Sequence, residues 1–106
     1  RSSEQRRILS VVPMLTEVLR CPQSYACAQM SLVILERCTV WARARWATEA
    51  RDEAQRIVKT MKRCDIVGAL LGCQAHFHGP SSEFVLHANQ TLLGVDYLLH
   101  AAGLRE

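Results

Sequence analysis

The amino-acid sequence predicts an all-α fold, organised as an antiparallel bundle or a short solenoid-like array of four to five helices. Apolar residues recur at i, i+3 and i+4 in every long segment, which is the spacing of amphipathic helices. Runs of β-branched apolar residues are only two or three residues long, so no strand competes with this pattern. With 106 residues and 49% hydrophobic composition, the chain fits a single helical interaction domain spanning residues 1–106.

The first helix is expected over residues 4–21. Pro13 lies inside its apolar pattern and cannot donate a backbone hydrogen bond, so it should kink the helix or mark a restart in its first turn. Pro22 should end the helix, and Ser24 is a suitable N-cap for the next one. These residues predict a tight helical hairpin.

Residues 25–71 are expected to form two helices. One continuous helix would be about 70 Å long, which is too long for a compact domain of 106 residues. The break should lie within residues 46–50, where Thr48 can cap a second helix whose first turns carry acidic side chains. Gly72 suits a C-terminal cap, and residues 73–82 then form the main loop.

The last helix should begin with Ser81 or Ser82 as its cap and end at Gly103. Gly94 lies in its middle, where glycine costs about 1 kcal/mol relative to alanine. Close approach of a neighbouring helix is the better explanation for that glycine.

No motif indicates catalysis or nucleotide binding. The five glycines match neither the dinucleotide-binding pattern nor the phosphate-binding loop. Asp52 and Glu53 are adjacent and therefore point to different helix faces, which does not favour a paired acid and base. We expect no enzyme, no catalytic residue, no cofactor and no small-molecule substrate.

Cys73, His76 and His78 form a short cluster of residues that can ligate zinc. A fourth ligand is not evident nearby, although His87 of the following helix is a candidate. We expect a polar surface loop here and no bound metal, with a zinc site as the alternative.

The cysteines indicate a reducing compartment, because they are odd in number and contain no Cys-x-x-Cys pair. We interpret them as reduced core residues of a protein of the cytosol or nucleus, and of these two we favour the cytoplasm. The uncharged stretch between Glu83 and Asp96 is too short and polar to span a membrane. The five are Cys21, Cys27, Cys38, Cys64 and Cys73.

Charge is segregated along the chain. Residues 1–63 hold 12 of the 13 basic residues and 6 of the 10 acidic ones, which favours an acidic partner. Arg56, Lys59 and Arg63 follow one another at i, i+3 and i+7 on one helix face, and Lys62 lies beside them.

A second row, Arg37, Trp41 and Arg45, recurs at i, i+4 and i+8, with Arg43 and Trp46 close in sequence. Arginine and tryptophan together favour a protein interface, and the alternative is a solvated face with core tryptophans. The candidate residues for an acidic partner are Arg37, Arg43, Arg45, Arg56, Lys59, Lys62 and Arg63, and those for a protein interface are Trp41 and Trp46.

Several segments together resemble a known family: Val12-Pro13, residues 17–19, Tyr25 and residues 31–37. Residues 51–53, 59–63 and 68–70, followed by Gly79, Phe84 and His87, continue the same order with similar spacing. The pattern is similar to the C-terminal helical domain of the regulatory, non-ATPase subunit of katanin. The chain departs from that family in the connection after the second helix, where it has only residues 43–51 in place of a longer Pro-rich segment.

The resemblance implies a non-catalytic domain that forms a heterodimer with the N-terminal domain of the severing ATPase and helps to bring it to microtubules of the cytoskeleton. Microtubules expose acidic tubulin tails, to which a basic half would be complementary. Two alternatives stay open. One is a fragment of an armadillo- or HEAT-like helical scaffold, and the other, less favoured, is a basic helical domain that binds nucleic acid.

Overall fold

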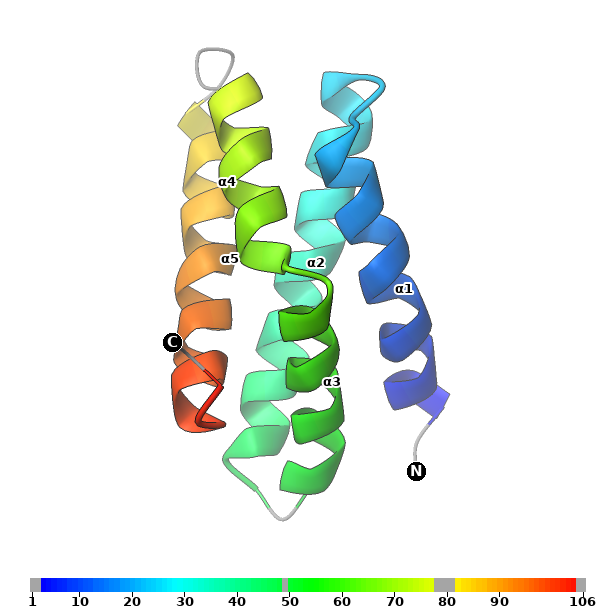
Figure 1. Ribbon diagram of the computed structural model, residues 1–106, viewed down its shortest axis with the longest axis vertical. Coiled ribbons are helices and arrows are strands. Elements are labelled where there is room, and N and C mark those ends of the chain that lie inside the picture. The colour runs from blue at the N-terminus through cyan, green and yellow to red at the C-terminus, as the bar shows by residue number, and fades with distance from the viewer. Residues whose placement is uncertain (1–2, 49, 78–81, 105–106) are drawn as a thin grey trace.

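The computed structural model describes residues 3–48, 50–77 and 82–104, and within them it contains helices and no strand. This confirms the predicted all-α class. Five helices follow one another along the chain (Figure 1): α1 Ser3–Arg20, α2 Tyr25–Trp46, α3 Arg51–Arg63, α4 Ile66–His76 and α5 Ser82–Ala101.

The five helices form four rods, because α4 continues in nearly the direction of α3 (Figure 1). Successive rods run antiparallel: α1, then α2, then α3 with α4, then α5. As a result α1 packs in parallel against α3 and α4, and α2 packs in parallel against α5. The helix α2 is central, since it contacts α1, α3 and α5. The predicted antiparallel bundle is therefore confirmed for successive rods. The structure adds that α1 runs parallel to α3 and α4, and that α2 runs parallel to α5.

The apolar core runs along the inner faces of all five helices. Its buried hydroxyl groups are satisfied locally: Thr16, Thr60 and Thr91 each donate to the carbonyl four residues earlier, so they add no unpaired donor to the interior. The largest fully buried apolar side chains are Leu19, Leu32, Leu35, Ile57, Met61, Ile66, Leu70, Phe84 and Leu98.

The hairpin between α1 and α2 forms as predicted. The helix α1 runs through Pro13 as one element, so the expected restart at that proline does not occur. It ends at Arg20, and the Ser24 hydroxyl accepts a hydrogen bond from the backbone N–H of Cys27 at 3.1 Å. Ser24 is thus the N-cap of α2.

The break between α2 and α3 lies where it was predicted, but Thr48 does not cap α3. The N-cap is Ala50, which makes no side-chain hydrogen bond. The Thr48 hydroxyl donates to the carbonyl of Arg45 at 3.0 Å and accepts from the N–H of Ala50 at 3.3 Å. Thr48 therefore stabilises the turn that precedes the helix, two residues before the N-cap.

A second break, not predicted from the sequence, separates α3 from α4 at Asp65. This residue has a left-handed backbone with φ of 54°, and its carboxylate accepts a hydrogen bond from the N–H of Gly68 at 3.2 Å. A Cβ on Gly68 would overlap with that carboxylate. Arg20 donates to the carbonyls of Cys64 and Asp65 and so satisfies the end of α3.

The predicted cap at Gly72 is wrong, because α4 continues through it to His76. The first part of the expected loop over residues 73–82 is therefore helical. Phe77 then packs edge-on against Tyr25 and Phe84, with ring centroids 5.5 and 5.7 Å apart. This apolar anchor favours a longer helix and a shorter loop.

The predictions for the ends and the middle of α5 have different outcomes. Ser81 lies outside the described residues, and Ser82 is the first residue of the helix. Gly94 does lie against another helix, because a Cβ on it would be 3.2 Å from the hydroxyl oxygen of Thr39. Gly103 has φ of 71°, and the N–H of Leu104 bonds the carbonyl of Leu99 at 2.8 Å, so it ends α5 as predicted.

All five cysteines are free thiols, but only some are core residues. Cys38 and Cys73 are buried, Cys64 is half-buried, and Cys21 and Cys27 are exposed. Burial raises the pKa of the Cys38 thiol to about 11 and also raises the pKa of Cys73. The core-packing prediction is thus confirmed for two of the five.

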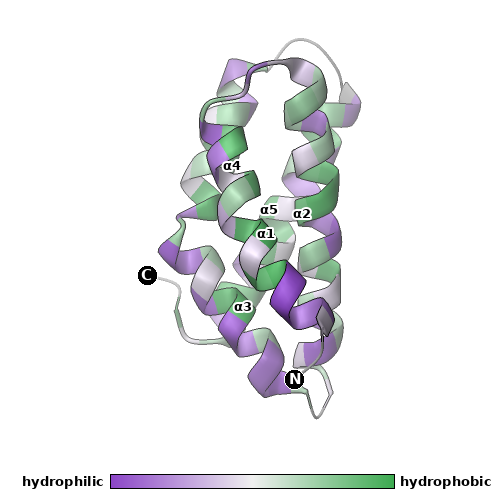
Figure 2. Ribbon diagram, turned by 90° about the vertical axis from the view of Figure 1, so that its right-hand side faces the viewer, coloured by the Kyte–Doolittle hydropathy of each residue, from purple (hydrophilic) through white to green (hydrophobic). Residues whose placement is uncertain are grey.

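The hydrophilic residues are concentrated on α3 and on the first turns of α1 (Figure 2). By contrast, α4 contains no lysine, arginine, aspartate or glutamate. In the part of the chain that the structure describes, no helix has the length and apolar character needed to cross a bilayer.

Candidate functional site: a basic groove between α1 and α3

The basic row predicted on α3 lies on the exposed side of that helix. Arg56, Lys59 and Arg63 are all exposed, as expected for residues at i, i+3 and i+7. The opposite side of α3 enters the core through four buried apolar residues: Ala54, Ile57, Val58 and Met61. The amphipathic pattern of α3 therefore turns its basic row toward the solvent.

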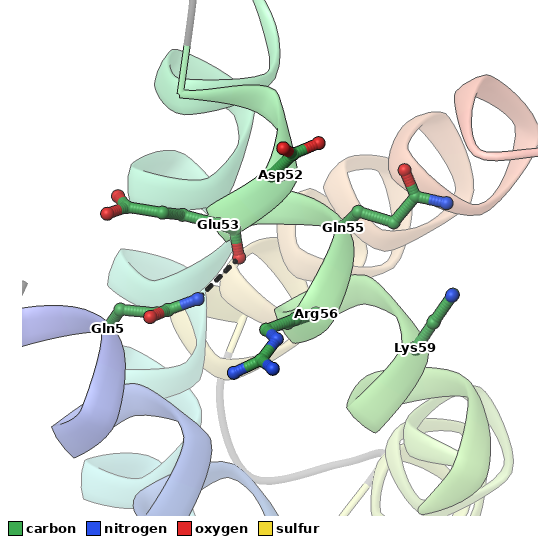
Figure 3. Close-up of a pocket in the computed structure, with 6 residues that line it drawn as sticks. All are labelled: Gln5, Asp52, Glu53, Gln55, Arg56 and Lys59. Carbon is green, nitrogen blue, oxygen red and sulfur yellow. Dashed lines mark hydrogen bonds between the residues drawn. The ribbon is translucent and has the colours of Figure 1, made fainter. Parts of the chain in front are cut away.

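The row borders a groove between α1 and α3, here called the basic groove. Two adjoining hollows make up this groove and share Arg56 and Lys59. The first, of about 590 Å³, is shown in Figure 3, and its lining residues are Gln5, Asp52, Glu53, Gln55, Arg56 and Lys59. The second, of about 330 Å³, is lined by Leu9, Arg56, Lys59, Thr60 and Arg63.

Gln5 joins the two walls of the basic groove. Its side-chain amide donates to the backbone carbonyl of Glu53 at 3.3 Å (Figure 3), and the residue is almost fully buried. Gln5 thus connects α1 to the first turns of α3. Sequence reasoning missed this residue, although it occupies the apolar side of α1, one turn before Leu9.

The charges of the basic groove change sign along its length. Asp52 and Glu53 lie at the N-terminal end of α3 and line the same hollow as Arg56. Glu53 also faces Arg45 of α2 at 3.7 Å. Among the described residues, no carboxylate forms an ion pair with Arg56, Lys59 or Arg63. Their charges are therefore available to another molecule.

Lys62 is exposed, but it is not among the residues that line either hollow of the basic groove. The sequence grouped it with Arg63 because the two are adjacent. Lys62 points about 100° away from Arg63 around the helix but lies one turn from Lys59, so it is at the edge of the row and outside the groove.

The row on α2 links helices within the domain. The indole N–H of Trp41 donates to the carboxylate of Glu4 at 3.2 Å, and the guanidinium of Arg45 lies 4.6 Å from the Trp41 ring. Arg45 also faces Glu4 at 3.9 Å and Glu53 at 3.7 Å. Trp41 and Arg45 therefore connect α2 to both α1 and α3, and the charge of Arg45 is offset by two carboxylates.

Trp46 is a core residue and is not exposed for binding. Only 9% of it is accessible. Arg51 covers its ring at 5.2 Å from the centroid and donates to its carbonyl at 3.2 Å. The alternative of a core tryptophan is correct for this position, because Trp46 fills the end of the bundle where α2 turns into α3.

The two remaining predicted arginines lie on different sides of α2. Arg37 lines a hollow between α1 and α2 together with Arg7 and Trp41. Arg43 lies on the side of α5, with its guanidinium 5.1 Å from the centroid of the Tyr97 ring. The structure thus separates both arginines from the basic groove.

The candidate zinc ligands do not converge within the described residues. Cys73 is buried on α4, and His76 is exposed and packs edge-on against Phe77 at 4.6 Å. His78 lies outside the described residues. His87 is hydrogen-bonded to Glu36 of α2 at 2.7 Å. In the described ranges, no three histidine, cysteine or acidic side chains form a group that could hold a metal.

Comparison of the chain with protein-family models, with curated proteins and with solved structures finds no match.

Proposed function

We propose that this chain is a non-catalytic interaction domain that holds an acidic segment of another protein in the basic groove. The observation that carries the proposal is the row of Arg56, Lys59 and Arg63. The three cations share one exposed face, border a groove and form no ion pair with a described carboxylate.

The spacing of the row fits a short acidic segment. Arg56 and Arg63 are separated by about 10 Å along the helix axis. An extended chain places every second side chain on one side at intervals of about 7 Å, so two or three acidic residues can face the row. Such contacts are mainly electrostatic, so added salt weakens them.

Asp52 limits where the acidic segment lies. Its carboxylate and that of Glu53 are at the end of the groove that precedes Arg56. A partner carboxylate placed there would be repelled. The acidic segment therefore occupies the part of the groove between Arg56 and Arg63, and a neutral or basic partner residue faces Asp52.

The resemblance to the katanin regulatory subunit supplies a specific form of this proposal. In that form the acidic segments are tubulin tails on the microtubule surface, and the domain also binds the N-terminal domain of the severing ATPase. The domain then acts in the cytoplasm, on the cytoskeleton, as a targeting element of a microtubule-severing complex.

Co-sedimentation with microtubules tests the electrostatic contact. The double variant Arg56→Glu/Arg63→Glu is expected to bind at least tenfold more weakly at low salt than the unmodified chain. The matched control, Arg7→Glu/Arg37→Glu, changes the net charge equally but alters the hollow between α1 and α2. Equal losses for the two pairs, or unchanged binding of the first pair, would contradict the proposal.

A pull-down with the N-terminal domain of a katanin ATPase subunit tests the second contact. Capture of that domain supports the katanin-type complex. If the groove binds microtubules but no ATPase domain is captured, the katanin assignment fails while the acidic-segment proposal stands. Competition by DNA as strong as that by tubulin would instead favour the nucleic-acid alternative.

A further inference from the structure

A hollow outside the basic groove lies between α1 and α2 and contains two arginines, one from each helix. Its volume is about 250 Å³, and its lining residues are Glu4, Arg7, Ile8, Arg37, Cys38 and Trp41. It is called the α1/α2 hollow below. Arg7 and Arg37 are exposed, and among the described residues no carboxylate forms an ion pair with either of them. The α1/α2 hollow therefore offers two guanidinium groups to another molecule.

The two arginines stand at the same level of the bundle. The indole N–H of Trp41 on α2 donates to the carboxylate of Glu4 on α1 at 3.2 Å. The two helices run antiparallel (Figure 1), so a step forward along α1 matches a step backward along α2. Three residues forward from Glu4 is Arg7, and four residues backward from Trp41 is Arg37. At about 1.5 Å per residue, the two arginines lie within about 2 Å of each other along the bundle axis.

Two arginines at one level can bind a single anion between them. The axes of packed helices are about 8–10 Å apart, a distance that two arginine side chains span when an anion lies between their ends. A carboxylate has two oxygens and is matched by one guanidinium, whereas a phosphate monoester has three acceptor oxygens and about two negative charges. The pair of Arg7 and Arg37 therefore suits a phosphate monoester better than a carboxylate.

The carboxylates nearest to this pair are engaged elsewhere. Glu4 lines the α1/α2 hollow, but its carboxylate faces Arg45 at 3.9 Å. Glu36 is adjacent to Arg37 in sequence, yet it lies toward α5, where it is hydrogen-bonded to His87 at 2.7 Å. The α1/α2 hollow therefore keeps a net positive charge.

The rest of the α1/α2 hollow is apolar and small. Ile8 is half-buried and Cys38 is buried, and opposite charges attract one another more strongly beside apolar groups than in open water. Pockets that enclose small-molecule ligands measure about 300–1,000 Å³, which is larger than this hollow of about 250 Å³. Its size therefore suits one phosphorylated side chain that projects from a peptide segment lying across the surface.

We propose that the α1/α2 hollow binds a phosphoserine side chain of a protein partner. The inference rests on the proposed function in one respect, namely that the domain holds other proteins. It adds a second site with a different ligand, because the α1/α2 hollow shares no lining residue with the basic groove. Phosphorylation of the partner then strengthens its attachment to the domain.

A short peptide that carries one phosphoserine among neutral residues tests the proposal. When it is titrated into the ¹⁵N-labelled domain, saturable shifts should be largest at the amides of Arg7 and Arg37 and at the indole N–H of Trp41. The variant Arg7→Gln/Arg37→Gln should bind about tenfold more weakly. The matched control, Arg56→Gln/Arg63→Gln, removes the same charge from the basic groove and should bind within about twofold of the unmodified chain. All four arginines are exposed, so neither pair of substitutions disturbs the core.

Two further comparisons separate recognition of phosphate from general attraction of charge. The variant Arg7→Lys/Arg37→Lys keeps the charge but loses the forked donor groups, so it should recover only part of the binding. A peptide with glutamate in place of the phosphoserine should bind about tenfold more weakly. Full recovery by the lysine variant, or equally tight binding of the glutamate peptide, would overturn the proposal.

Other sources of phosphate would give different results. Inorganic phosphate that binds as tightly as the peptide would assign the α1/α2 hollow to a free anion, and an oligonucleotide that competes as strongly would assign it to nucleic acid. Either result, or absence of peptide binding, overturns the proposal. The two proposals fail separately, because Arg56→Glu/Arg63→Glu should leave phosphopeptide binding intact and Arg7→Gln/Arg37→Gln should leave microtubule binding intact.

Discussion

Gly94 of α5 lies directly against Thr39 of α2, so that a Cβ on the glycine would be 3.2 Å from the Thr39 hydroxyl oxygen and 3.3 Å from its Cβ. The threonine is not free to move away, because its hydroxyl donates to the carbonyl of Glu36 at 2.7 Å. The contact between the two residues therefore sets how closely α2 and α5 approach.

Replacement of Gly94 by valine should lower the free energy of unfolding by about 2 kcal/mol, because the added methyl groups must displace Thr39. The same substitution at Gly72 is the control, since a Cβ there meets nothing within 4 Å. Gly72→Val should change stability by no more than about 0.5 kcal/mol. Urea unfolding of both variants measures the difference, and equal losses would refute the close contact.

The stability of the domain should depend on which residue replaces Asp65. Asp65→Asn keeps a side-chain acceptor for the N–H of Gly68 and tolerates the left-handed backbone, so stability should change little. Asp65→Ala loses the cap and is strained at φ of 54°, which should cost about 2 kcal/mol. Asp65→Gly should fall between them. Thermal unfolding orders the three, and an alanine variant as stable as the asparagine variant would disprove the cap.

The five thiols should differ in reactivity. Cys21 and Cys27 are exposed and should react first with a disulfide reagent at pH 8, whereas the buried Cys38 should react only on unfolding. Equal rates for Cys38 and Cys21 would contradict the structure.

Cys38 should also make stability depend on pH in the alkaline range. Its pKa is raised by burial from 9.0 to about 11, so above pH 9 the unfolded chain loses a proton that the folded chain keeps. The stabilisation from the protonated thiol is complete below pH 9 and is lost as the pH rises toward 11. In the Cys38→Ala variant, the free energy of unfolding should fall less steeply between pH 9 and 11 than in the unmodified chain. If it falls equally steeply, groups other than Cys38 cause the decline.

Most of the fold follows from local patterns in the sequence. Apolar periodicity identifies the helices, and Ser24, Gly94 and Gly103 each have the role that their residue type predicts. The break at Asp65 was missed although part of its signal is local: aspartate is a common N-cap residue, and the N–H that it caps is only three residues away, at Gly68. The contact from Arg20 of α1 joins segments 44 residues apart and leaves no periodic signal.

The candidate site could be predicted only in part. Helical spacing is enough to place Arg56, Lys59 and Arg63 on one side of α3. It could not show that Gln5 forms the opposite wall of the groove, nor that Arg45 is offset by Glu4 and Glu53. Those facts depend on which helices become neighbours, and that is decided by packing of the whole core.

The most direct test of the central claim is to locate an acidic peptide on the domain. A tubulin-tail peptide rich in glutamate, titrated into the ¹⁵N-labelled chain at low salt, should shift the amide signals of residues around the basic groove, above all Gln5, Leu9, Arg56, Lys59 and Arg63. The shifts should diminish as salt is added. Saturable shifts centred elsewhere on the surface, or no shifts at any peptide concentration, would contradict the account.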